Sequence, residues 1–408
     1  MEKILLKDKF ENLLSAKVQG ALLACAKVAE ENDYKIYLVG GIVRDLILEN
    51  KICDIDVIVE GNAVDFAKLI EKSMPAEIIQ VQEDLKTAKV MFDDIEIDFA
   101  STRKEKYPKS GFLPVITEFG VPIKEDAIRR DFTINSMYIP LFGEHAFELI
   151  DFFAGYYDIK YKYIRVLHDK SFIDDPSRII RGLKFSVRLG FELDNHTKEL
   201  QDKYLSQEKC FDFPLERTKC ELKDLFSLDC FAFSFDEFIR QKVYLLFCGG
   251  IDSGVTGSNL HNTVTLFDIT RKDVWFLCLA VCLVNVSEVC IEKLNLSSHE
   301  AKIITDLSGM LHLPRLCCNT NIEIYKFFED KDKISIAAYY VYTEDQKALY
   351  FYNDLKDIRL LISGEDIIDL GLKPSKKFKE LLDKVLEAKL DGKIATFEEE
   401  KAYLKTLI

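Results

Sequence analysis

The sequence predicts an α+β fold in which an N-terminal sheet domain is followed by an elongated, mainly α-helical region. Strand-like segments, in which apolar and polar residues alternate, fall before about residue 150. Amphipathic helices are expected from about residue 176, and helical periodicity dominates from about Asp236 to the C-terminus. The chain has 408 residues, more than one ordinary hydrophobic core usually supports. We therefore expect domains at residues 1–150, 151–235 and 236–408.

The sheet domain is predicted to alternate helices and strands. Gly40 and Gly41 end the first strand, and Asp93–Asp94 forms a turn between the last two strands. In order, the predicted segments are a helix up to about residue 34, a strand at 36–39, a helix at 43–48, a strand at 54–60, a helix at 63–72, and strands at 86–92 and 95–100.

The region after the sheet domain is predicted to be helical. Amphipathic helices are expected at 176–189, 196–205 and 215–226, and breaks at Gly249–Gly250, around Gly254–Gly257 and at Pro314. The longest apolar run, 274–286, is shorter than the roughly 18 to 20 residues that span a bilayer. It therefore predicts a buried helix, and no membrane partner is expected.

The cysteines and the N-terminus predict a cytoplasmic protein. The eleven cysteines are scattered and include no Cys-X-X-Cys pair, so neither a disulfide framework nor a structural zinc site is expected. We expect them to be buried as small apolar side chains. Charged residues begin at the second position, and no signal-peptide cleavage site follows.

Two carboxylates on the second strand predict a metal site. Asp54 and Asp56 are two residues apart, so on a strand both point to one face while Ile55 points into the core. Two acids on one face repel each other unless a cation lies between them. Mg²⁺ prefers hard oxygen ligands and commonly uses one or two carboxylates together with substrate phosphates. Two such ions, roughly 3.5–4 Å apart, would activate a hydroxyl and stabilise a leaving pyrophosphate.

The glycine pair before the next helix predicts a phosphate site. Glycine permits close backbone approach, and the amides at a helix N-terminus can bind a triphosphate. Gly40 and Gly41 occupy that place, and Arg44 lies one turn further on.

Taken together, these motifs resemble a known family. An Asp-X-Asp or a Gly-Gly alone is weak evidence, but GGIVRD followed about ten residues later by DID is specific. The sequence resembles the polymerase-beta nucleotidyltransferase superfamily, and specifically the class II tRNA nucleotidyltransferase and bacterial poly(A) polymerase family. The resemblance implies a catalytic head at 1–150, a nucleotide-selecting neck at 151–235, and a tRNA-binding body and tail at 236–408.

Further family motifs follow in order along the chain. Asp98, on the strand at 95–100, resembles a third carboxylate near the metals. The segment RRDFTIN at 129–135 resembles the motif that contacts the ribose and phosphates of the incoming nucleotide. The residues implied for that role are Arg129, Arg130, Asp131 and Asn135.

A base-selecting pair is implied by the segment DDPSR at 174–178. By position, Asp175 and Arg178 are the selectors, and they share one face of a helix that starts near Pro176. Cytosine and adenine both present an amino donor beside a ring-nitrogen acceptor, which Asp and Arg match. Uracil and guanine would leave buried groups unpaired. Further on, Arg217 and Glu221 are spaced to pair with each other.

A basic cluster near the C-terminus resembles the family's tRNA-binding tail. Its members are Lys373, Lys376, Lys377 and Lys379. The net charge of −14 argues against a generally basic nucleic-acid binder, so phosphate contacts are expected on one local surface.

The resemblance implies addition of CCA to the 3′ end of tRNA from CTP and ATP, with two Mg²⁺ ions as cofactors. CC-adding, A-adding and poly(A)-adding enzymes share these motifs and remain open as alternatives. They differ in the loop at 107–123, whose length favours an enzyme that completes A addition. A small-molecule nucleotidyltransferase or an inert RNA-binding protein fits less well, because the extra helical region and all these acids and arginines are present.

Overall fold

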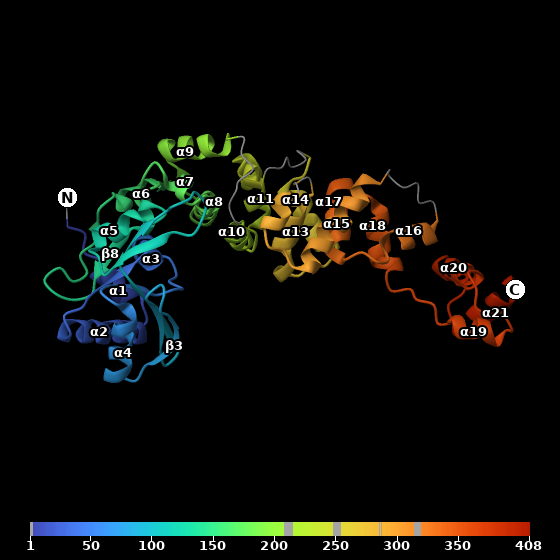
Figure 1. The fold of residues 1–408 in the computed structure, drawn as a ribbon, viewed down its shortest axis with the longest axis horizontal. Coiled ribbons are helices and arrows are strands. Elements are labelled where there is room, and N and C mark those ends of the chain that lie inside the picture. Colours follow the sequence, from blue (N-terminus) through green and yellow to red (C-terminus); the bar gives the residue numbers. More distant parts are fainter. Residues whose placement is uncertain (1–2, 208–214, 248–253, 285, 287, 314–319) are drawn as a thin grey trace. The chain divides into compact units, whose positions relative to one another are not determined.

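The computed structural model describes residues 3–207, 215–247, 254–284, 286, 288–313 and 320–408. The chain divides into two compact units, Met1–Glu221 and Leu222–Ile408. The first contains the sheets, and the described part of the second is helical (Figure 1). The predicted fold class is therefore confirmed. The domain limits expected at residues 150 and 235 stay a prediction.

A seven-stranded sheet forms the centre of the first unit, in the order β3-β4-β5-β2-β1-β8-β9. Strands β2 and β5 are parallel, and the other neighbouring pairs are antiparallel. The start of β2 therefore lies between the end of β1 and the middle of β5, where Asp98 is the register partner of Asp56. The strands are β1 (Lys35–Val39), β2 (Asp56–Glu60), β3 (Glu77–Gln82), β4 (Thr87–Phe92), β5 (Ile95–Ser101), β8 (Met137–Pro140) and β9 (Ile150–Asp151).

Two helices, α2 (Ala16–Glu31) and α4 (Ala63–Ser73), pack against this sheet (Figure 1). The apolar residues of α4 recur at helical spacing, and its Phe66 ring lies 5.6 Å from that of Phe99 on β5. The single helix expected before residue 34 is in fact two. The Ser15 side chain caps α2 and separates it from α1 (Lys7–Leu13).

The remaining elements of the first unit follow the predicted pattern closely. The segments expected at 43–48, 176–189, 196–205 and 215–226 form α3 (Gly41–Leu48), α8 (Ser177–Leu189), α9 (Asn195–Leu205) and α10 (Glu216–Phe226). The loop at 107–123 is partly ordered, because β7 (Val115–Phe119) pairs with β6 (Arg103–Lys106). The other short elements are α5 (Ile123–Ile128), η1 (Thr133–Asn135), α6 (Gly155–Tyr161), β10 (Tyr163–Ile164), α7 (Ser171–Asp174) and β11 (Glu192–Leu193).

Close packing of α6 fixes the segment that precedes β8. A side chain at Gly155 would place its Cβ 2.3 Å from the carbonyl oxygen of Thr133, so only glycine fits. The Thr133 hydroxyl donates to Asp158 at 2.6 Å, and Asp151 accepts from the backbone at the start of α6. These contacts hold η1, and with it the RRDFTIN segment, in one place.

The second unit surrounds a buried apolar helix, α13 (Arg271–Leu283), which corresponds to the apolar run at 274–286. It packs against α15 (Ser298–His312) and α17 (Lys333–Thr343). The other elements are α11 (Phe231–Arg240), η2 (Val243–Phe247), α12 (Gly257–Leu266), α14 (Glu288–Lys293), α16 (Asn321–Phe328), α18 (Gln346–Tyr350), η3 (Phe351–Leu355), α19 (Gly364–Asp369), α20 (Lys377–Leu390) and α21 (Phe397–Leu407).

The helical break expected around Gly254–Gly257 is confirmed. Residues 254–256 are not helical, and α12 begins at Gly257, whose amide donates to Asp236 and where a Cβ would meet the Ala232 carbonyl. The breaks at Gly249–Gly250 and Pro314 lie outside the described residues.

The membrane and cysteine expectations have different outcomes. None of the helices within the described ranges is long and apolar enough to cross a membrane. Of the cysteines that the structure describes in detail, Cys25, Cys278 and Cys282 are buried. Cys53, Cys220 and Cys230 are exposed, so the expectation of burial is wrong for these three, which lie at turns or on outward helix faces.

Candidate active site

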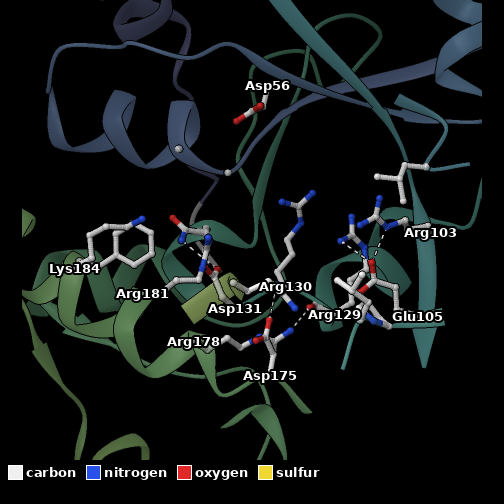
Figure 2. A pocket seen from close by; sticks show the side chains of 18 of the residues that line it. Asp56, Arg103, Glu105, Arg129, Arg130, Asp131, Asp175, Arg178, Arg181 and Lys184 are labelled. Carbon is white, nitrogen blue, oxygen red and sulfur yellow. Dashed lines mark hydrogen bonds and ion pairs between the residues drawn. The ribbon is translucent and has the colours of Figure 1, made fainter. Parts of the chain in front are cut away.

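A cavity of about 700 Å³ in the first unit gathers the predicted nucleotide-binding residues. Asp54, Asp56, Asp175 and Arg178 line it together with four residues of RRDFTIN, namely Arg129, Arg130, Asp131 and Asn135, and Figure 2 shows many of these side chains converging. The full lining is Gly40, Gly41, Arg44, Asp54, Asp56, Leu85, Arg103, Glu105, Tyr107, Leu113, Pro114, Ile116, Arg129, Arg130, Asp131, Asn135, Asp175, Arg178, Arg181, Lys184, Phe185, Arg188 and Arg217.

The charge of this lining differs from that of the whole chain. Nine arginine and lysine side chains face five carboxylates around the cavity, whereas the whole chain carries a net charge of −14. A concave site with excess positive charge attracts polyanions such as a nucleoside triphosphate. The structure therefore concentrates basic residues where the sequence as a whole is acidic.

The two predicted catalytic acids lie at the start of β2. Only Asp56 belongs to the strand; Asp54 lies in the segment before it and is exposed, so the prediction that both are strand residues is corrected. Immediately before the strand, the Ile55 carbonyl accepts a hydrogen bond from the Asp98 amide at 2.9 Å. Ile55 is buried, as predicted, and the two carboxylates on either side of it both reach the cavity.

Electrostatics at Asp56 favour a bound cation. Burial raises the pKa of Asp56 to about 6, the charges of Asp98 and Asp54 add to this rise, and Arg130 opposes it. The ionised form is therefore held in an environment that disfavours it. Hard carboxylate oxygens of this kind suit Mg²⁺, so the two residues fit the predicted metal role.

Asp98 does not line this cavity, although its charge acts on Asp56. Its Cα is the register partner of Asp56, but its carboxylate accepts from Lys89 at 3.1 Å. It lines a neighbouring groove of about 410 Å³ that Asp56 also borders. Within the described ranges, no group of three or more His, Cys, Asp or Glu side chains is placed to hold a metal ion. A metal-proximal role for Asp98 stays a prediction.

The predicted triphosphate residues form one wall of the cavity. Gly40 caps α3 with φ of +76°, and a Cβ there would lie 3.9 Å from the Asp56 carboxylate and 3.8 Å from Arg130. Glycine therefore keeps the space between these groups open. Arg44 is almost fully buried and donates to Asp45 at 2.8 and 3.1 Å and to Asn135 at 2.7 Å. A phosphate contact by Arg44 stays a prediction.

The two arginines of RRDFTIN share one buried carboxylate that the sequence analysis did not single out. Asp126, with no exposed surface, accepts from Arg129 at 2.9 Å and from Arg130 at 3.0 Å. Burial raises the pKa of Asp126, but the charges of Arg130 and Arg129 outweigh it and hold the pKa below its usual range. Arg130 also stacks over Tyr138 and points toward Asp56 (Figure 2).

Removal of this carboxylate is expected to destabilise the first unit. Asp126→Ala removes the buried carboxylate that both partly buried guanidinium groups share, which costs about 3–5 kcal/mol of the free energy of unfolding. Thermal or urea denaturation measures the loss. Glu125→Ala is the matched control, because Glu125 is the preceding residue on α5 and forms an exposed pair with Lys104 that contributes about 0–1 kcal/mol. Equal stability of the two variants would contradict this assignment.

Asp131 and Asn135 are tied to helices α8 and α10. Arg181 of α8 donates to Asp131 at 3.0 Å and to Glu221 at 3.0 Å. Burial raises the pKa of Asp131, but Arg181 outweighs it and lowers the pKa to about 2. Asn135 donates to the other oxygen of Asp131 at 3.2 Å and accepts from Arg44. The ribose role predicted for both residues stays a prediction, and their positions place them on the cavity wall.

Asp175 and Arg178 are brought into the cavity but are not bonded to each other. Asp175 accepts from the amide and the hydroxyl of Ser177, the first residue of α8, at 3.1 and 2.6 Å. Its other oxygen accepts from Arg217 at 2.7 Å. The expectation that Arg217 pairs with Glu221 is therefore wrong, because the fold brings Glu221 to Arg181 and Lys184 instead.

Arg178 is held by three contacts. It donates to the Ser171 hydroxyl at 2.8 Å and to the Arg129 carbonyl at 2.7 Å, and it lies 3.5 Å from the Tyr107 hydroxyl. These contacts account for three of its five N–H groups. Both Asp175 and Arg178 are nearly fully buried, so the geometry of the pair is fixed before any ligand arrives.

Several cavity residues were not assigned to the site from the sequence. Arg181 and Arg188 were given no role from the sequence, yet they line the cavity with Lys184. Arg178, Arg181, Phe185 and Arg188 recur at spacings of three and four, which places them on one helix face. This stripe on one helix face was the sequence signal that could have assigned Arg181 and Arg188 to the site. Arg103 and Arg217, which come from other elements, carried no comparable pattern.

The predicted RNA-binding lysines lie in the second unit. Lys373, Lys376, Lys377 and Lys379 are all exposed, and they flank the start of α20. Their helix packs on a separate apolar cluster that contains Ile367, Val385 and Leu404. Exposure and shared charge suit contact with a phosphate backbone, and this role stays a prediction.

Comparison with known proteins gives a consistent result. Residues 36–165 match the Poly A polymerase head domain. The A-adding tRNA nucleotidyltransferase of Geobacter sulfurreducens is 29% identical over 92% of this chain and 45% of its own length. This chain thus spans less than half of that relative. The CCA-adding enzyme of Bacillus pumilus is 27% identical over 90% of this chain and 92% of its own.

Solved structures resemble the whole chain. An apo CCA-adding enzyme superposes with a TM-score of 0.82 at 26% identity, covering 100% of this chain and 99% of the other. A Thermotoga maritima CCA-adding enzyme complexed with tRNA gives a TM-score of 0.74 at 26% identity, with the same coverage. Residues 36–165 thus match a Poly A polymerase head domain, and most of the chain is similar to CCA-adding enzymes and A-adding tRNA nucleotidyltransferases in sequence and in fold.

Proposed function

We propose that this protein adds CCA to the 3′ end of tRNA, using CTP and ATP and without a nucleic-acid template. The observation that carries the proposal is a single cavity that contains paired acids, a glycine-capped helix, basic residues and a buried Asp–Arg pair. The relatives and solved structures named for this activity support it, including the enzyme complexed with tRNA. A cytoplasmic location follows from the substrate.

Asp54 and Asp56 would hold two Mg²⁺ ions in the proposed reaction. When bound, the ions would activate the attacking 3′ hydroxyl and stabilise the leaving pyrophosphate. Asp56 contributes a carboxylate whose ionised form is disfavoured without a cation, so binding relieves its repulsion from Asp54 and Asp98. Arg130 lies between Asp56 and the base-selecting pair, where it would contact the phosphates (Figure 2).

Asp175 and Arg178 would act as a protein template. Each Asp175 oxygen has two acceptor positions, so the carboxylate can accept from the amino group of C or A while Ser177 and Arg217 hold it. Three of the five N–H groups of Arg178 are used in its protein contacts. One of the remaining N–H groups would donate to the ring nitrogen of the same base. Uracil and guanine present a carbonyl to Asp175 and an N–H to Arg178, and both contacts would be repulsive.

Addition of A alone is a second candidate. The relative from Geobacter sulfurreducens that spans 92% of this chain carries the name of an A-adding enzyme. An A-adding enzyme would share the same cavity, acids and selecting pair, so the distinction rests on which tRNA ends the protein accepts.

Extension of three tRNA transcripts is expected to decide between the two. The transcripts end before CCA, after C and after CC, and each is incubated with Mg²⁺ and CTP, ATP or both. Completion of all three to CCA is the expected result. Extension of the CC-ended transcript alone would establish A addition, and arrest at CC would establish CC addition. Long A tails would identify a poly(A) polymerase, and no extension would reject the proposal.

The tail lysines complete the proposed interaction with tRNA. Lys373, Lys376, Lys377 and Lys379 would contact the phosphate backbone of tRNA away from its 3′ end. Such contacts neutralise phosphates and release counterions, so the affinity for tRNA would fall with salt concentration.

A further inference from the structure

One cavity side chain, Tyr107, has no role in the reaction as set out above. It is the first residue after β6 and is partly buried on the cavity wall, next to the base-selecting residues. The turn that follows it is attached to α7: the Gly111 amide donates to the Asp174 carbonyl at 3.1 Å, and the Ser110 hydroxyl donates to the Ile173 carbonyl. Tyr107 is therefore held near α7 and α8 by backbone contacts on its C-terminal side.

Contacts between Tyr107 and Arg178 are of two kinds. The Tyr107 hydroxyl lies 3.5 Å from an Nη of Arg178, at the long end of hydrogen bonding. The Arg178 guanidinium carbon also lies 5.9 Å from the centre of the Tyr107 ring, within the range of a cation–π contact. The same Nη donates to the Arg129 carbonyl at 2.7 Å, so Tyr107 and Arg129 together determine where this nitrogen points.

The electrostatic setting keeps the Tyr107 hydroxyl protonated. Burial raises the pKa of Tyr107, and the positive charge of Arg178 only partly opposes this rise. The hydroxyl oxygen can therefore accept from Arg178 while its own proton remains available to donate. The other aromatic residue among the described cavity lining, Phe185, already has Arg44 at 5.3 Å and Arg181 at 5.9 Å from its ring. Tyr107 is thus the aromatic side chain that adjoins the selecting pair.

We propose that Tyr107 is a positioning residue for base selection, acting through Arg178. Its hydroxyl fixes the orientation of the guanidinium that reads the base, and its ring bounds the space that the base enters. The inference rests on the proposed function, because it assumes that Arg178 reads the incoming nucleotide. It adds a residue from the β6–β7 hairpin to a selecting pair that otherwise comes from α8 and the residue that follows α7.

Two variants of Tyr107 separate the hydroxyl from the ring. Tyr107→Phe removes only the hydroxyl and is expected to raise KM for CTP and ATP about tenfold, since a hydrogen bond to a charged group is lost. The preference for CTP over UTP is expected to fall by a similar factor, with kcat changed less than about twofold. Tyr107→Leu removes the ring as well and is expected to lose more of this preference, because base–aromatic contacts are also lost.

Tyr161→Phe is the matched control. Tyr161 is 63% exposed on α6 in the same unit and does not line the cavity, so its variant should match the wild-type protein. Melting temperatures of all variants show whether a change is merely structural. The inference would be overturned if Tyr107→Phe kept the wild-type preference for CTP over UTP. It would also be overturned if the variant lost activity equally with every nucleotide and the loss lay in kcat alone.

Equilibrium binding of CTP and UTP to the free protein separates this inference from the proposed reaction. A wild-type protein that fails to extend tRNA would reject the reaction. If it still bound CTP in preference to UTP, and Tyr107→Phe reduced that preference, the positioning role would stand. If tRNA were extended normally and the binding preference did not depend on Tyr107, the reaction would stand and the positioning role would fall.

Discussion

Replacement of Asp56 by alanine is expected to reduce nucleotide addition by about 10³-fold or more. Metal ions contribute several kcal/mol to stabilisation of a transition state at phosphorus, and each 1.36 kcal/mol corresponds to about tenfold in rate. Asp56 is the more enclosed of the two acids and the one whose pKa is raised, to about 6, by burial and by Asp98 and Asp54. Asp54→Ala is expected to act in the same direction.

The fold should survive the loss of Asp56. A carboxylate whose pKa is raised in the folded state destabilises that state at neutral pH, where it must ionise. Asp56→Ala should therefore melt at or above the wild-type temperature without metal. Single-turnover extension of a tRNA transcript measures the rate, and binding of Mn²⁺ to the free protein reports on the metal site directly.

Glu30→Ala provides the control for this prediction. Glu30 is an exposed carboxylate on α2 in the same unit and does not line the cavity. Its variant should keep both the rate and Mn²⁺ binding. If Asp56→Ala retained wild-type addition, the two-metal assignment would be wrong.

Arg178→Ala is expected to abolish base discrimination more than it impairs folding. Loss of charged hydrogen bonds to the base should lower the preference for CTP over UTP about 10²-fold. The variant also leaves the Ser171 hydroxyl and the Arg129 carbonyl without a donor, which costs about 1–3 kcal/mol of stability. Arg178→Lys keeps the charge and loses the planar fork, so it should lose discrimination at a smaller cost in stability.

Arg188→Ala is the informative comparison for Arg178. Both arginines lie on α8 and line the cavity, but Arg188 is at the far end of the helix from Asp175. Its loss should weaken binding of all four nucleotides alike, as removal of a general positive charge does. Steady-state kinetics with each nucleotide separate the two patterns. Rejection of UTP by Arg178→Ala as strong as in the wild-type protein would rule out the protein template.

Local sequence pattern predicted many of the helices and strands. It succeeded where the apolar positions of the pattern are those that face the core. The apolar residues of α4 recur at helical spacing and face the sheet, and β4 and β5 alternate about a turn at Asp93–Asp94. The beginning of β2 was predicted two residues early. Asp54 continues the alternation, but strand pairing begins at Asp56, and alternation alone cannot show where a partner strand starts.

The sequence by itself predicted the type of chemistry that we propose, and the tertiary structure decided how the charged groups are paired. Gly40–Gly41, Asp54, Asp56, RRDFTIN and Asp175–Arg178 are recognisable because each motif is short and local. Long-range partners leave no such trace: Arg217 bonds to Asp175 and not to Glu221, and Asp126 holds both arginines of RRDFTIN. Charged side chains pair with whatever the fold brings within about 4 Å, and that distance is set by packing of elements far apart in sequence.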